Sequence, residues 1–331
     1  MMKFKKKAVP LNNDNITTYI RSYALVGIFL LMCIAFAIAS PTFLSLTNII
    51  GVLRQISTNG ILAIGMTLVI ITAGIDLSIG PLCAIAGVVS ALILEKYEDM
   101  FLVAVLIGIL AAAVMSMWTA FLVSKMKVPP FIATLSTMSV AEGVALVIAD
   151  GVPHSISNET YVQLGNGYLW DPNKTGGLSI PISVLILVIV AVIIAIVLYK
   201  TKFGRHIYAV GGNENAAIAS GINAARVKFC TYVLNGLLCG IAGIVLAGRI
   251  TSGQPTAASG YEMDAITAVI VGGTSMTGGV GKISGTIIGV LIIGVLSNGL
   301  ILMGVSSYYQ QIIKGIIIAA AVLLDMRTKK A

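Results

Sequence analysis

Long apolar runs alternate with short polar connections along most of this sequence. A helix needs roughly 20 apolar residues to cross a bilayer, so the runs predict about ten membrane helices with soft ends. We place them at 24–40, 55–72, 77–94, 101–123, 129–148, 180–199, 228–248, 263–280, 283–303 and 309–326. The second, third and eighth are the least regular, because Gly, Pro or polar residues interrupt them.

The composition supports an all-α polytopic membrane protein. Of the 331 residues, 57% are hydrophobic and 10% are charged, whereas a soluble domain carries about 25% charged residues. No connection is long enough for a soluble catalytic domain. The expected organisation is a cytoplasmic N-terminal segment (1–23), one transmembrane domain (24–326) and a cytoplasmic tail (327–331). The basic N-terminus and the apolar run after it imitate a signal peptide. The length of the basic region and the nearby Pro41 favour an uncleaved first membrane helix.

The net charge of +8 is distributed as membrane orientation requires, and not as nucleic-acid binding would require. With a cytoplasmic N-terminus and ten spans, the outer side receives only Arg54, Lys96, Lys174 and Arg249. Lys314 falls within the last span, and the other Lys and Arg residues fall inside, as the positive-inside rule demands. Both termini are therefore expected in the cytoplasm. The outer connection 149–179 is expected to be irregular, with room for a short hairpin or surface helix.

The hydrophilic stretch 200–228 separates two apolar runs on the inner side. Asn213 can cap a short helix over 214–220, and Gly221 can end it. Isolated helices under about 12–15 residues are marginal in water. This helix is therefore predicted to need a partner surface.

A second polar interruption lies at 72–81, within an apolar run. Asp76 can cap the next helix after a tight cytoplasmic turn. Alternatively, Asp76 and Ser78 belong to a discontinuous membrane helix that lines a polar pathway. Asn59 and Asn298 lie in spans and either hydrogen-bond between helices or line the same pathway. These four residues are the candidate pathway residues.

The Gly-rich stretch 271–285 imitates a phosphate-binding loop but does not match one. Met276 stands where the pattern needs Gly, and Ile283 follows Lys282 where it needs Ser or Thr. We expect a tight inner loop and then a helix with small residues at four-residue spacing for close packing: Gly281, Gly285 and Gly289.

Enzyme signals are absent from the sequence. No catalytic residue, metal ligand set or cofactor site is predicted, and the two histidines, His154 and His206, are expected on opposite sides. On the outer side, Arg249 is expected to pair with Glu262 or Asp264. The alternative is that Arg249 and Arg54 dock an acidic partner.

Four stretches together resemble the membrane subunit of the bacterial ribose-type ABC importers. They are GMTLVIITAGIDLSIG (65–80), PPFIATLSTM (129–138), KTKFGRHIYAVGGNENAAIASGIN (200–223) and QPTAASGYEMDAITAVIVGGTSMTGGVGKISGTIIG (254–289). The resemblance covers residues 41–326 as a set.

The resemblance implies a permease of a bacterial inner membrane importer for a monosaccharide such as ribose. It implies a fold similar to the ten-helix vitamin B12-type permease, in the lipid bilayer. It also implies a second permease copy (homodimer or heterodimer), an ABC ATPase that carries ATP and Mg, and an external sugar-binding protein.

In that family the loop between the sixth and seventh spans holds a coupling helix that contacts the ATPase, and 200–228 lies between the same spans. The coupling residues by this resemblance are Gly211, Gly212, Asn213, Glu214, Ala216, Ala217, Ser220 and Gly221. Ala217→Arg is expected to spare folding and abolish ATPase stimulation. The alternative function is an ion-coupled secondary transporter or channel that works without an ATPase.

Overall fold

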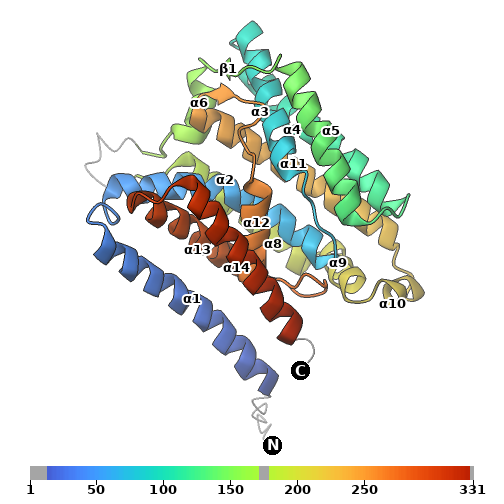
Figure 1. The fold of residues 1–331 in the computed structure, drawn as a ribbon. Coiled ribbons are helices and arrows are strands. Elements are labelled where there is room, and N and C mark those ends of the chain that lie inside the picture. The colour runs from blue at the N-terminus through green and yellow to red at the C-terminus, as the bar shows by residue number, and fades with distance from the viewer. Residues whose placement is uncertain (1–12, 171–178, 329–331) are drawn as a thin grey trace, which may run out of the picture.

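The computed structural model describes residues 13–170 and 179–328, and these residues are mostly helical (Figure 1). In chain order the elements are α1 (Asn13–Ala39), α2 (Leu46–Ile71), α3 (Ile79–Lys96), α4 (Phe101–Ser124), α5 (Pro130–Ile148), β1 (His154–Ser155), α6 (Glu159–Asn166), α8 (Ile182–Lys200), α9 (Lys202–Gly212), α10 (Glu214–Ala219), α11 (Ala224–Ile250), β2 (Ser252–Gly253), α12 (Tyr261–Val271), α13 (Ile283–Leu302) and α14 (Ser307–Thr328).

Seven of the described helices are long and apolar enough to cross a membrane: α2, α3, α4, α5, α8, α11 and α13. Two more, α1 and α14, contribute shorter apolar stretches over Leu25–Ala39 and Ser307–Leu323. The chain is therefore a polytopic helical membrane protein, as the apolar runs predict.

The centre of the bundle is formed by α2, α3 and α11, with α11 packed against each of the other two. About two thirds or more of each of their most apolar windows is buried inside the protein, against 28% for α4, α5 and α8. The outward faces of these three peripheral helices carry exposed Leu, Ile and Val side chains, such as Leu110, Val147 and Ile193. Such apolar outer surfaces suit contact with lipid.

The eighth predicted span, 263–280, is wrong as a continuous helix. The helix there, α12, has only 11 residues and ends at Val271. At about 1.5 Å per residue it covers roughly 16 Å, half of a hydrocarbon core of about 30 Å. Gly272 and Gly273 follow, and Gly273 has φ +87°, a left-handed conformation that stops the helix.

The small-residue face expected on the next helix is confirmed. A side chain at Gly285 would begin 2.1 Å from the carbonyl oxygen of Gly272, and one at Gly289 would begin 1.9 Å from that of Ala268. Helices α12 and α13 therefore approach each other at backbone contact. A Cβ at Gly281, just before α13, would lie 2.7 Å from Ile71.

The connections gather at two ends of the bundle. In Figure 1, α9 and α10 lie toward the lower right, and the N-terminal end of α1 and the C-terminal end of α14 lie toward the bottom. Helix α6 and strand β1 lie toward the upper left. β1 pairs antiparallel with β2, with His154 opposite Gly253. The connection 149–179 thus contains the expected short helix, α6, and its strand pairs with the segment after α11. Residues 171–178 of this connection, including Lys174, lie outside the described residues, as do residues 1–12 and 329–331.

Candidate functional site

The short helix of the hydrophilic loop forms as predicted. Asn213 has an extended backbone, and its Oδ1 accepts from the amide of Ala216 at 3.0 Å, so it caps α10. Gly221, at φ +83°, ends the turn after Ser220. Lys228, on α11, bonds Glu214 at 2.6 Å and ties α10 to the helix that follows. The cap and the ion pair compensate for the small intrinsic stability of six helical residues.

Most side chains of α10 face outward, but Ala217 does not. Ala217 is only 5% exposed and belongs to the hydrophobic core, so the expectation that Ala217→Arg spares folding is wrong. Ala216, Glu214, Ser220 and the flanking Gly212 are exposed. The large exposed apolar residue of this helix is Ile218, 54% exposed, which the sequence reasoning missed.

The base of this loop is fixed to the end of α2. A Cβ at Gly211 would lie 1.6 Å from the carbonyl oxygen of Ile71, so only Gly fits there. That same oxygen accepts a bond from the amide of Gly279 at 2.9 Å. The hydroxyl of Tyr208 on α9 donates to the carbonyl of Gly281 at 2.7 Å. Helix α9, the end of α2 and the 272–282 segment therefore form one packed unit beneath α10.

Asp76 and Ser78 meet between α2 and α3. Oδ1 of Asp76 accepts from the amide of Ser78 at 2.9 Å and from its hydroxyl at 2.5 Å. Oδ2 accepts from Nδ2 of Asn235 on α11 at 2.8 Å. Tyr232, also on α11, donates its hydroxyl to the carbonyl of Ile75 at 3.1 Å.

The observed arrangement has features of both alternatives for Asp76, the helix cap after a tight turn and the discontinuous helix. The Asp76 carboxyl group accepts a hydrogen bond from the amide at the start of α3, but it is 0% exposed and packs against the middle of α11. Asn235 lies 11 residues after Ala224, where α11 begins, or about 16 Å along the axis. The break between α2 and α3 is thus deep in the bundle, and Tyr232 and Asn235 of α11 form hydrogen bonds with its polar groups.

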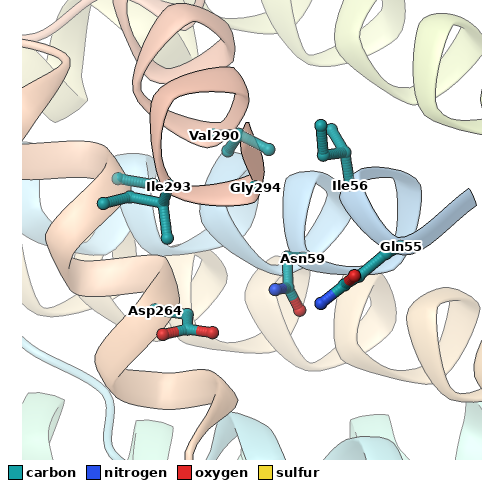
Figure 2. Close-up of a pocket in the computed structure, with 8 residues that line it drawn as sticks. Gln55, Ile56, Asn59, Asp264, Val290, Ile293 and Gly294 are labelled. Atoms are coloured by element: carbon teal, nitrogen blue, oxygen red, sulfur yellow. The ribbon is translucent and has the colours of Figure 1, made fainter. Parts of the chain in front are cut away.

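Asn59 lines a pocket between α2, α12 and α13 (Figure 2). The pocket has about 240 Å³ of empty space, counted with the open region at its mouth. Gln55, Asn59 and Asp264 form its polar side. Its apolar lining is Ile56, Ala268, Val290, Ile293 and Gly294. Oδ1 of Asn59 is buried and has no hydrogen-bond partner among the described residues.

Asn298 lies elsewhere, in a reciprocal amide pair. Its Nδ2 donates to Oδ1 of Asn48 at 2.8 Å, and Nδ2 of Asn48 donates back at 3.0 Å. This pair joins α13 to α2, as interhelical hydrogen bonding predicts. The four candidate pathway residues therefore occupy three separate places.

Arg54 and Arg249, the two candidate docking arginines, are half-buried and already engaged. A guanidinium nitrogen of Arg54 donates to the carbonyl of Asn166, and the group lies 4.5 Å from the centre of the Tyr168 ring. Arg249 bonds the hydroxyl of Tyr261 at 3.4 Å. Nδ2 of Asn166 also bonds the carbonyl of Arg249 at 2.8 Å, so α6 connects α2 to the end of α11.

The expected pairing of Arg249 with Glu262 or Asp264 is wrong. Asp264 pairs instead with Lys314 on α14, at 2.8 Å, and the ion pairs of the described residues include none with Arg249 or Glu262. The sequence contained a signal for this contact, because a Lys within a membrane span needs a partner. A lateral contact between α12 and α14 supplies it, whereas sequence proximity suggested Arg249.

Comparison with known proteins identifies the class. Residues 48–322 match the family described as the permease component of the branched-chain amino acid transport system. The chain is 47% identical over 304 residues to the ribose import permease protein RbsC of Bacillus subtilis, covering 91% of both chains. It is 44% identical to RbsC of Escherichia coli K12, covering 91% of this chain and 92% of that protein, and 36% identical to the L-arabinose transport system permease protein AraH, covering 93% and 92%. No solved structure matches.

The fold and these matches define a multi-pass transport permease. The chain belongs to this family of transport-system permease components, because the match covers most of its length and the relatives are more than 30% identical.

Proposed function

We propose that this chain is the transmembrane permease subunit of an ATP-driven importer for a monosaccharide, with ribose as the first substrate to test. The observation that carries this proposal is the 47% and 44% identity to two ribose import permeases over 91% of the chain. The arabinose relative, at 36%, supports the wider monosaccharide class.

The proposed topology has ten crossings in a bacterial inner membrane, with both termini cytoplasmic. The distribution of Lys and Arg supports this orientation. Helix α12 and the irregular 272–282 segment would together make the eighth crossing, because irregular backbone is tolerated at membrane depth where protein covers it. The resemblance to the vitamin B12-type fold, and a dimer of permeases, belong to the same proposal.

Helix α10 is the proposed contact for a separate ATPase, which would carry ATP and Mg. Two structural features support it. Ile218 presents an exposed apolar side chain on a capped, Ala-rich helix, and Gly211 fixes the adjacent helix α9 to the end of α2. An ATPase that binds α10 differently in its nucleotide states would therefore displace α2 directly. Such differential binding is the physical requirement for driving a conformational change.

The assembly test is purification of the chain with its native partners. We expect an ATP-binding subunit to copurify, and we expect sugar uptake into vesicles to require that subunit, ATP and an external sugar-binding protein. Uptake by the isolated chain under a proton or sodium gradient would contradict the proposal and favour an ion-coupled transporter. Titration of the binding protein with ribose, arabinose and other sugars identifies the substrate.

The contact test is Ile218→Glu. Placing a charge in an apolar contact is expected to reduce sugar-stimulated ATPase activity by about tenfold or more, equal to about 1.4 kcal/mol of lost interaction. The matched control is Val152→Glu, because Val152 is 51% exposed but lies in the turn before β1 at the other end. Equal losses in both variants would rule out α10 as the specific contact.

A further inference from the structure

Asp76 is a completely buried carboxyl group whose hydrogen-bond donors are all neutral. They are the amide and hydroxyl of Ser78 and the side-chain amide of Asn235. None of the ion pairs in the described part of the chain involves Asp76. A buried ionised carboxylate is very costly unless a cation compensates it.

The elements that pack around the break offer no such cation. On α11 the titratable groups that interact with Asp76 are Tyr232 and Cys239. On α3, Cys83 lies beside Cys239, and on α12, Glu262 faces Gly80. All four groups are acids. Helix α4 has no titratable side chain.

The basic residues of the neighbouring elements lie away from the break. Arg54, Lys96 and Arg249 are near the opposite helix ends. Lys228 pairs with Glu214, and His206 of α9 is half-buried. The others are exposed: Lys202, Arg205, Arg226 and Lys282.

Asn235 lies where it can accept a proton carried by Asp76. Its Oδ1 is buried and has no hydrogen-bond partner among the described residues, although its Nδ2 bonds Asp76. The O and N of an Asn amide are assigned from the surrounding hydrogen bonds. If Asp76 carries a proton on Oδ2 and the Asn235 amide is turned by 180°, Oδ1 of Asn235 accepts a hydrogen bond from that proton. That arrangement gives the amide oxygen a donor and removes the uncompensated charge, while Nδ2 takes the position that has no partner among the described residues.

We propose that Asp76 is a proton-binding site: in this conformation it is a neutral carboxylic acid that donates its Oδ2 proton to Oδ1 of Asn235. When the break between α2 and α3 opens to water, the O–H bond breaks and the proton passes to solvent. The carboxylate that remains keeps the two Ser78 donors. Proton binding thereby favours the closed form of the break.

The break is connected mechanically to the polar loop. Ala73 packs against Gly278, and Ile71 accepts from Gly279 and contacts Gly211 at the base of α10. Movement of α9 and α10 would therefore shift the 72–78 segment and hydrate Asp76. The proton site itself does not depend on the proposed substrate.

A bound monovalent cation fits the geometry less well. Three hydrogen bonds already occupy the two oxygens of Asp76. The described residues contain no group of three or more His, Cys, Asp or Glu that could hold a metal ion. A proton needs one acceptor, and Asn235 supplies it.

The test is infrared spectroscopy of the purified full chain in lipid nanodiscs, in potassium buffer near neutral pH. A protonated carboxylic acid has a C=O stretching band separate from those of carboxylates and amides, and the band shifts in D₂O. We expect this band in the native chain and its loss in Asp76→Asn, which keeps the shape and neutrality of the acid. Glu262→Gln is the control for a second buried acid, and the Asp76 band should remain.

Two further measurements keep the proposal falsifiable if Asp76→Asn folds poorly. Ser78→Ala removes a donor that favours the carboxylate, so the pH midpoint of the band should rise. Replacing potassium by sodium should leave the band unchanged. A band that is absent in native protein, or that Asp76→Asn leaves intact, overturns the proposal. Loss of the band in sodium alone overturns it in favour of a cation site.

Discussion

Lys314 of α14 and Asp264 of α12 form an ion pair, with 2.8 Å between Nζ and Oδ1, beside the pocket that Asn59 lines. Their side chains are 21% and 12% exposed. The two opposite charges compensate each other, and the pair fixes the short helix α12 against the last helix, α14. Since α12 is too short to span the membrane by itself, this attachment to α14 helps to hold it in place.

Removing one partner of this pair should destabilise the protein more than removing both. A lone charge left in a fully buried site costs about 3–5 kcal/mol, and the partial exposure here reduces the expectation to about 1–3 kcal/mol. We expect Lys314→Met to lower the thermal unfolding temperature in detergent. Lys314→Met combined with Asp264→Asn should recover part of the loss. A double variant no more stable than the single one would show that the charges are not coupled.

Gly211 and Gly212 form a matched pair of adjacent glycines. Gly211→Ala would place a methyl group 1.6 Å from the carbonyl oxygen of Ile71, whereas Gly212→Ala meets nothing within 4 Å. Overpacking costs about 1–3 kcal/mol or more, and Ala in place of an exposed helical Gly tends to stabilise by up to about 1 kcal/mol. Thermal unfolding of both variants should therefore shift in opposite directions. Equal behaviour would mean that α9 does not rest on the end of α2.

His154 and Glu95 form a pH-dependent contact at the end that carries α6. Nδ1 of His154 lies 2.7 Å from Oε2 of Glu95, and this bond raises the pKa of the histidine above its ordinary value of about 6.5. Because the folded pKa is the higher one, the stabilisation is complete below pH 6.5. It is lost as the pH rises through the folded pKa.

The predicted size of this effect is small, because Glu95 is 58% exposed and exposed pairs contribute about 0–1 kcal/mol. The unfolding temperature should decline between about pH 6.5 and the folded pKa by an increment that Glu95→Gln removes. Glu98→Gln, at the same end, is the control and should keep the increment. A decline that survives in Glu95→Gln would assign it to another group.

The helices of this protein were largely predictable, because each apolar run long enough to cross a bilayer consists of consecutive residues. The cap at Asn213, the stop at Gly221 and the close-packing face of Gly285 and Gly289 followed from local rules and are confirmed. The prediction of a continuous eighth span was wrong because a hydropathy average does not detect the turn of the backbone at Gly272 and Gly273.

The site residues were predictable as residue types but not as partners. Nothing in one sequence relates Asp76 to Asn235, 159 positions later. The position of Lys314 within a span signalled that it needs a partner, but not that the partner is Asp264, 50 positions earlier. Ala217 and Ile218 are neighbours in the chain, yet one is buried and the other exposed, because α10 rests on one face against the core.

The sequence by itself determined that the chain is a helical membrane protein and where its polar interruptions lie, because hydrophobic length and capping act over a few consecutive residues. The tertiary structure alone decided which polar groups compensate one another. Those partners come from different helices, and only the packing of α2, α3, α11, α12 and α14 brings them within hydrogen-bond distance.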